Sequence, residues 1–464
     1  MDSPPSSLNP NKHLKEQFVS NLAGSSMLEI AALSTIVPLL FVLRHVVCSN
    51  SRTDASAKKD DDAVFVSRSL WTYLATVTVD FLFIVLPALL FFTVLADWVY
   101  VFAVALVVLI SCIIIIAAKR FSSPTNGGES ITLRSNISSY RVSVIVMTCL
   151  CILAVDFEVF PRRYAKTETY GTSLMDLGVG SFVLANALVS RQARGISSVN
   201  WKTAIRSSSP LLVLGFARLL STRSVDYQVH VGEYGVHWNF FFTLAAVSIL
   251  TSTINIPPQH SGVLGSVVLI GYQCWLNHGL NVYLLSDKRG TDILSRNKEG
   301  IFSILGYWGM YLIGVQLGNF IFFGNGTSAL LRNNKWARFR VLFFSLMFWL
   351  ITVVLEKHVE RVSRRTCNLA YVSLVLAQNF QVLALLMLSD YVAGSKISAL
   401  EEAFDRNLLG SFLLANLLTG LVNLFVDTIF VPSLSAISIL LVYAYVLSIL
   451  TGIANFFGIR FKFW

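Results

Sequence analysis

Residues 156–178, DFEVFPRRYAKTETYGTSLMDLG, concentrate ionisable side chains in a chain that is only 13% charged. Two kinds of chemistry suit these residue types. A carboxylate such as Asp156 can remove the proton of an alcohol while a cation such as Lys166 stabilises a developing oxyanion. Paired arginines, here Arg162 and Arg163, can instead bind phosphate. A charged turn held by salt bridges is the alternative without chemistry.

The segment needs a bend to bring these side chains together. Pro161 is expected to end the helix that Asp156 closes, because proline lacks a backbone donor and redirects the chain. If a helix resumes beyond it, residues spaced by three or four share one face. Those residues are Lys166, Thr169, Ser173 and Asp176. The sequence then predicts that an ammonium and a carboxylate face each other at the membrane edge.

A second polar island, YQVHVGEYGVHWNFFF, spans residues 227–242. Glu233 and His237 are four residues apart, the spacing of one helix face. A metal site is not predicted, because the sequence supplies no third ligand. The island is expected on the same side of the membrane as residues 156–178, so the two can share one cavity. His237, Trp238 and Asn239 are the candidate substrate contacts here.

The composition predicts an all-α polytopic integral membrane protein. The chain is 55% hydrophobic and 12% aromatic over 464 residues, well above the apolar share of soluble domains. Runs of about 18 or more apolar residues recur, each long enough to cross a hydrocarbon layer of about 30 Å. A net charge of +10 resides in short loops between these runs, so membrane orientation explains it better than nucleic-acid binding.

A polar segment, 1–26, precedes a multi-span membrane domain, 27–464, with about 13 predicted transmembrane helices. The runs are 27–47, 70–93, 98–118, 142–158, 172–190, 208–221, 238–257, 263–285, 300–323, 337–355, 367–390, 407–429 and 433–457. The bias of Lys and Arg predicts a cytosolic C-terminus, with the N-terminus and residues 156–178 on the opposite side. The sequons at Asn136 and Asn325 would then face the cytosol and stay unmodified.

Residues 180–190, GSFVLANALVS, are similar to residues 410–420, GSFLLANLLTG. Two helix-packing surfaces of similar composition explain this, and so does an inverted repeat of the kind found in transporters. A polytopic transporter with an intramembrane charged site is therefore an alternative function. A structural membrane subunit is another. An acyltransferase built around an intramembrane histidine is a third, with His278 as its candidate.

Residues 156–183, DFEVFPRRYAKTETYGTSLMDLGVGSFV, resemble the signature of the inositol acyltransferases of glycosylphosphatidylinositol (GPI) anchor biosynthesis, the class W family, and a plant member in particular. EYGVHWNFFFTLA, NKEGIFSILGYWGMYLIGVQLG, NLAYVSLVLAQN and FLLANLLTGLVNLFVDT resemble its other blocks. The resemblance implies transfer of a fatty acyl group, typically palmitoyl, from acyl-CoA to the inositol ring of glucosaminyl-phosphatidylinositol. It also implies an endoplasmic reticulum membrane protein with 13 spans and a luminal signature block.

The family's essential acid–base pair corresponds to Asp156 and Lys166. Our hypothesis makes Asp156 the general base, with Lys166 orienting it or stabilising the oxyanion, while Arg162 and Arg163 hold phosphates of CoA or lipid. The other expected substrate contacts are Thr167, Glu168, Ser173, Asp176, His237, Trp238 and Asn239. We expect direct transfer, acyl-CoA as co-substrate without a further cofactor, and an acyl slot between spans such as WNFFFTLAAVSIL.

Overall fold

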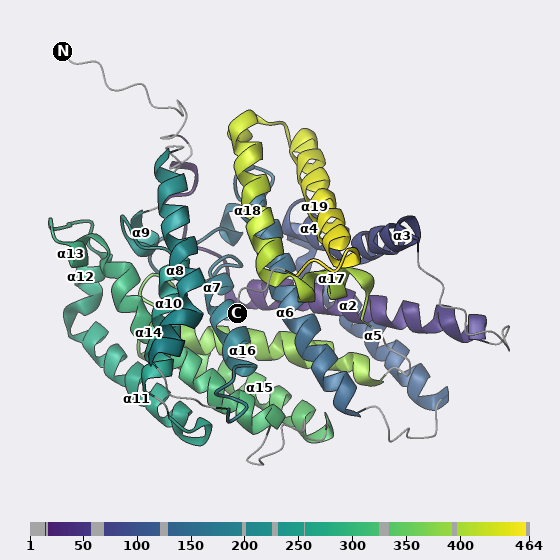
Figure 1. The fold of residues 1–464 in the computed structure, drawn as a ribbon, viewed down its shortest axis with the longest axis horizontal. Coiled ribbons are helices and arrows are strands. Elements are labelled where there is room, and N and C mark those ends of the chain that lie inside the picture. Colours follow the sequence, from purple (N-terminus) through teal and green to yellow (C-terminus); the bar gives the residue numbers. More distant parts are fainter. Residues whose placement is uncertain are drawn as a thin grey trace.

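The computed structural model describes residue 14 and residues 17–56, 69–120, 129–196, 201–224, 231–254, 256–323, 334–391 and 397–460 (Figure 1). Within these ranges the regular structure is helical, and the β pairing is limited to isolated bridges from residues 24–25 to Thr172. The predicted all-α class is confirmed for the part of the chain that the structure describes.

The longer helices carry the apolar runs. They are α2 (Met27–Ser56), α3 (Leu70–Asp80), α4 (Leu86–Phe92), α5 (Val99–Arg120), α6 (Glu129–Ala154), α7 (Leu177–Leu188), α8 (Trp201–Ser224), α10 (Phe240–Thr253), α11 (Pro258–Trp275), α14 (Lys298–Gly318), α15 (Asn334–His358), α16 (Leu369–Leu386), α18 (Leu408–Phe425) and α19 (Ser433–Phe456). Shorter ones are α9 (Val231–Tyr234), α12 (Asn281–Leu285), α13 (Ile293–Arg296) and α17 (Ala399–Arg406). Single π turns, Phe81–Val85, Leu276–Leu280 and Asn319–Phe323, extend α3, α11 and α14.

Among the described residues, nine helices are long and apolar enough to cross a membrane, which confirms a polytopic membrane protein. Three further apolar helices are shorter: Leu177–Leu188, Ser208–Ser221 and Phe240–Thr253. Each of the 13 predicted runs coincides with helix, but the count of 13 spans stays a prediction.

Burial separates inner helices from outer ones. In the most apolar window of α2 and of α16, 78% of residues are buried, against 17% in the window over α5, which has the highest hydropathy of all. A helix that faces lipid is stabilised by apolar side chains on its outer surface, whereas inner helices can carry polar groups that pair with neighbours. α16 packs against α15, α2, α6 and α7 and so forms the centre of the bundle (Figure 1).

The signature block is an ordered loop rather than a resumed helix. After a single 3₁₀ turn, Arg162–Tyr164, the chain stays non-helical until α7 begins at Leu177. Its backbone is held from outside: Glu168 N donates to Leu22 O at 2.9 Å, and Gly171 N donates to Val362 O at 2.8 Å. Gly171 has φ +133°, and a Cβ there would lie 2.1 Å from Ala23 O. The predicted shared helical face is therefore wrong, because backbone hydrogen bonds to the segments around Leu22 and Val362 hold these residues in a loop.

The sequon at Asn136 cannot report on membrane orientation. Asn136 lies inside α6, is buried, and donates from Nδ2 to Asp390 Oδ1 at 2.8 Å. A side chain enclosed in this way is inaccessible to glycosylation. The second sequon, Asn325, lies outside the described residues.

Candidate active site

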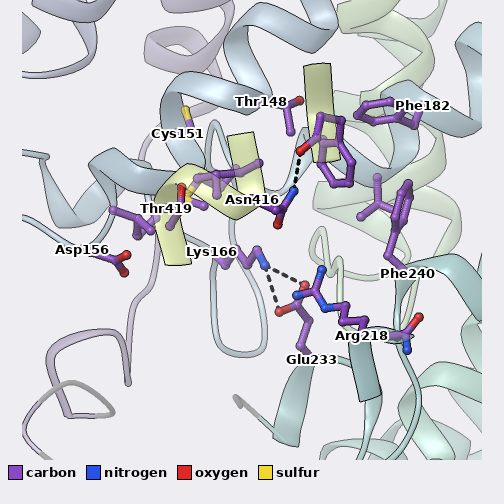
Figure 2. Close-up of a pocket in the computed structure, with 18 of the residues that line it drawn as sticks. Thr148, Cys151, Asp156, Lys166, Phe182, Arg218, Glu233, Phe240, Asn416 and Thr419 are labelled. Carbon is purple, nitrogen blue, oxygen red and sulfur yellow. Dashed lines mark hydrogen bonds and ion pairs between the residues drawn. The ribbon is translucent and has the colours of Figure 1, made fainter. Parts of the chain in front are cut away.

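A cavity of about 1320 Å³ lies among α6, α7, α8, α10, α16 and α18, beside the signature loop (Figure 2). Phenylalanines from three helices contribute to its apolar lining: Phe182, Phe240, Phe241 and Phe412. Charged side chains also reach it, namely Asp156, Lys166, Arg218, Glu233 and Asp427. The cavity thus combines a lipid-like lining with a charged rim.

The cavity is elongated along α6. Lining residues occur in adjacent pairs every four positions, at 143–144, 147–148, 151–152 and 155–156, which is one face of the helix and the turn after it. At a rise of about 1.5 Å per residue, this face extends about 20 Å. α18 runs beside it in the same direction, since Ser411 lies near Cys149 and Asn423 contacts Asp156.

Asp156 stands where α6 has just ended, and it lines the cavity although its exposed fraction is 6%. Asn423 in the last turn of α18 donates from Nδ2 to Asp156 Oδ2 at 2.7 Å. The same amide nitrogen lies 3.2 Å from Thr419 O, so the Asn423 side chain is itself oriented by its helix. The carboxyl group of Asp156 is therefore held in position at the cavity wall.

Lys166 also lines the cavity, but its partner is not a carboxylate of the signature block. Its Nζ donates to both oxygens of Glu233, at 2.8 and 2.9 Å (Figure 2). The expected pairing with a signature carboxylate is corrected accordingly. The expectation that the two polar islands share one cavity is confirmed, because Glu233 comes from the second island.

Cations hold Glu233 in its ionised form. Burial raises the pKa of this carboxyl, but Lys166 and Arg364 outweigh that effect and bring the pKa to about 2. Burial lowers the pKa of Arg364, while Glu233 and Asp176 raise it above its ordinary value. Glu233 is thus an anion at neutral pH and is unsuited to act as a base there.

Asp176 belongs to the structure of the loop and is absent from the cavity lining. Arg364 Nε donates to its Oδ1 at 2.8 Å, and Thr167 Oγ1 donates to its Oδ2 at 2.7 Å. The backbone N–H of Asp176 donates to Ser173 Oγ at 3.1 Å. Ser173 and Asp176 are each 1% exposed, and of these loop residues only Thr167 lines the cavity.

Arg162 binds the end of the preceding helix instead of facing the cavity. Its guanidinium donates to the carbonyl oxygens of Val155, Phe157 and Phe160 at 2.8 to 3.1 Å. Burial lowers its pKa to about 10, with Asp156 acting in the opposite direction. Arg162 therefore holds in place the turn that follows α6.

Arg163 and Glu168 also point elsewhere. Arg163 donates to Glu29 at 2.9 Å and to Asp97 at 2.7 Å. Glu168 lies 3.8 Å from Arg365. None of Arg162, Arg163 and Glu168 lines the cavity, so the structure gives the expected phosphate and substrate contacts of these three side chains no geometric support.

The second island presents two of its three candidates to the cavity. Asn239 caps α10 by accepting from Phe241 N at 3.0 Å and donates to Gly215 O at 2.9 Å. Trp238 lines the cavity beside it, with Nε1 donating to Thr243. His237 does not line it, and its N–H donates to Asn297. Residues 227–230 of this island lie outside the described residues.

The two similar segments, in α7 and α18, both line the cavity. Their equivalent residues Phe182 and Phe412 are in ring contact, with centroids 5.8 Å apart. This contact shows that the matched sequences meet at the same cavity, and whether they form an inverted repeat stays a prediction.

Several lining residues were not singled out from the sequence as site residues. They are Asn416, Thr419 and Asn423, and Arg364 behind the cavity was also missed; Arg218, which also lines the cavity, stood out in the sequence only as a charge within an apolar run. A signal existed for the α18 residues, because polar side chains at 416, 419 and 423 recur at helical spacing in an otherwise apolar run. His278 is exposed, donates from Nδ1 to Cys274 O, and is not part of the lining. The described residues include no metal-binding group of three.

Fold and site together define a polytopic helical membrane protein with an elongated, lipid-sized cavity and an ion pair at its rim. The chain belongs to the GWT1 family, whose model matches residues 11–454. It is 56% identical over 433 residues to an uncharacterised protein of Arabidopsis thaliana, covering 92% of this chain and 98% of that protein.

Two named relatives also match almost end to end. The phosphatidylinositol-glycan biosynthesis class W protein of Dictyostelium discoideum is 33% identical over 509 residues, covering 98% of this chain and 99% of its own. The GPI-anchored wall transfer protein 1 of Aspergillus oryzae is 37% identical over 505 residues, covering 96% and 97%.

Proposed function

We propose that this protein is an inositol O-acyltransferase of GPI-anchor biosynthesis. It moves a fatty acyl group, typically palmitoyl, from acyl-CoA to the inositol ring of glucosaminyl-phosphatidylinositol. The names of the relatives place those proteins in phosphatidylinositol-glycan biosynthesis and GPI anchoring. The observation that carries the proposal is that Asp156 and the Lys166–Glu233 pair line one elongated apolar cavity.

In the proposed step, Asp156 takes the proton of an inositol hydroxyl as its oxygen attacks the thioester carbonyl. A bond forms between the inositol oxygen and the acyl carbon, the carbon–sulfur bond breaks, and the proton passes to the departing CoA thiolate. Transfer is direct. Ser173, the signature-loop hydroxyl considered for an acyl-enzyme, is buried and accepts a hydrogen bond from Asp176 N away from the cavity.

Lys166 supplies the positive charge for this step. Glu233 fixes the ammonium from one side, so Lys166 stabilises the oxyanion of the thioester carbonyl from a preset position. Arg218 also lines the cavity and takes the phosphate-binding role first expected of Arg162 and Arg163. No cofactor beyond acyl-CoA is required.

The acyl chain occupies the apolar length of the cavity. Phe240 and Phe241 from the run WNFFFTLAAVSIL contribute to its wall and are in ring contact with Phe412 of α18. We propose that the reaction takes place in the endoplasmic reticulum membrane, which the resemblance to the class W family supports. Positive charge in the cytosolic loops favours a luminal signature block and a cytosolic C-terminus.

An in vitro assay tests this function. Microsomes from cells that lack inositol acylation, supplied with this protein, should convert glucosaminyl-phosphatidylinositol to its acylated form when palmitoyl-CoA is added. Free palmitate with free CoA is the matched control and should give no product, because the thioester is the activated donor. Absence of product with palmitoyl-CoA contradicts the proposal, and an acyl group recovered on the protein contradicts direct transfer.

A further inference from the structure

The end of the cavity far from Asp156 is polar. Ser143 is the lining residue of α6 most distant from Asp156 along the helix. Three other polar lining residues come from α2 and α16, namely Ser34, Gln378 and Asn379. α6 and α16 meet at this level, since Tyr140 OH donates to Asn379 at 2.8 Å. An apolar slot therefore meets a band of hydroxyl and amide groups at its far end, with Val382 beside them one turn further along α16.

Gln378 differs from its neighbours in its hydrogen bonding. Asn379 is satisfied by Tyr140, by Ser181 Oγ at 2.9 Å and by Val375 O at 2.7 Å. Neither side-chain atom of Gln378 has a partner among the described residues, although the residue is 1% exposed. Buried amides are nearly always hydrogen-bonded, because leaving one unpaired costs about 1–3 kcal/mol. Its partner must come from the contents of the cavity.

The distance suits a fatty acyl chain. The α6 face from Asp156 to Ser143 extends about 20 Å at about 1.5 Å per residue. One acyl chain spans half of a hydrocarbon layer of about 30 Å, or about 15 Å. A chain whose carbonyl lies beside Asp156 and Lys166 thus brings its methyl end to within about 5 Å of the level of Ser143.

We propose that Gln378 sets the upper limit of acyl-chain length, by forming with Ser34 and Ser143 a hydrated floor of the acyl slot. This inference rests on the proposed acyl transfer. A site with several polar partners retains water. A longer chain has to displace that water with methylenes, which cannot replace its hydrogen bonds. Chains that end above the floor are therefore transferred, and chains that would pass it are rejected.

The test compares transfer from myristoyl-, palmitoyl-, stearoyl- and arachidoyl-CoA. Gln378→Leu keeps the side-chain size and removes the polar floor, so the ratio of stearoyl to palmitoyl transfer should rise about tenfold, the factor for burying two more methylenes. Gln381→Leu is the matched control on the same helix. Gln381 is hydrogen-bonded to Thr35 and Trp349 and does not line the cavity. The ratio of stearoyl to palmitoyl transfer by Gln381→Leu should therefore stay at the wild-type value.

A second measurement uses the wild-type protein and does not depend on how the variants fold. Palmitoyl-CoA with a photoreactive group at the methyl end should crosslink to α16 near Gln378, and a mid-chain group should crosslink nearer Phe412. An unchanged chain-length profile in Gln378→Leu, or methyl-end crosslinks away from α16, overturns the inference while acyl transfer stands. If the wild-type protein transfers no acyl group, the proposed function itself fails.

Discussion

Asp156 and Asp176 are two carboxylates at opposite ends of the same signature loop, and the structure gives them different surroundings. Asp156 faces the cavity and accepts from the neutral amide of Asn423. Asp176 is 1% exposed, bonded to the guanidinium of Arg364 and to Thr167, and absent from the cavity lining.

The difference shows that neighbours, not residue type, separate a reactive group from a structural one. Burial raises the pKa of Asp176 against the opposing effects of Arg364 and Thr167, so it is enclosure away from the cavity that keeps this carboxyl from reacting with substrate. Asp156 also has a cation nearby, since it raises the pKa of Arg162, but it lines the cavity and can therefore accept a proton from substrate. The loop thus uses Asp176 to hold its shape and presents Asp156 for chemistry.

Asp156→Asn should have the largest effect on activity. The amide retains the shape and can still bond to Asn423, but it cannot accept the inositol proton. Acyl transfer should fall by about 10²- to 10⁴-fold, the usual contribution of a general base. Transfer in microsomes at equal protein levels measures this, with detergent-solubilised thermal stability as the check on folding. Near-normal transfer would remove Asp156 from the role of base.

Asp176→Asn should mainly lower the stability of the fold, whereas Asp156→Asn should mainly lower activity. Removing one partner of a buried ion pair costs about 3–5 kcal/mol, because the remaining charge is left uncompensated. Thermal unfolding in detergent should show a large drop in midpoint.

Asp97→Asn is the control. Asp97 pairs with Arg163 but its side chain is 85% exposed, so its loss should cost at most about 1 kcal/mol. Equal midpoints for the two variants would contradict a structural role for Asp176.

The membrane class and the shared cavity could be predicted because they follow from local patterns. Apolar runs determine the helices, and Lys166 and Glu233 stand in the two polar islands that the sequence already marked. The pairing of individual charged side chains could not be predicted in this way. Whether Lys166 meets Asp156, Asp176 or Glu233 depends on where α9 is packed, which is set by contacts with α14 from far along the chain.

The loop itself shows why local rules failed at residues 165–176. Polar residues in this segment stand at helical spacing, but no helix forms, because backbone hydrogen bonds to Leu22, Ser25 and Val362 hold the segment in a loop. The phosphate-binding prediction for Arg162 failed for a related reason. Paired arginines are typical of phosphate sites, but the Arg162 guanidinium instead donates to backbone carbonyls in the turn after α6.

Of the three variants, Glu233→Gln should have the smallest effect. The pH dependence of its unfolding midpoint gives a second test. Losing the charged partner should lower transfer about tenfold, or about 1.4 kcal/mol, because Lys166 is less well fixed.

The pKa of Glu233 is depressed to about 2 from an ordinary value of 4.5. A depressed pKa contributes stability above the ordinary value and loses it as the pH falls toward 2. The midpoint difference between wild type and Glu233→Gln should therefore be constant from about pH 5 to 8 and shrink below that window. A difference that changes near pH 7 would mean that Glu233 titrates there and that Lys166 does not hold it ionised.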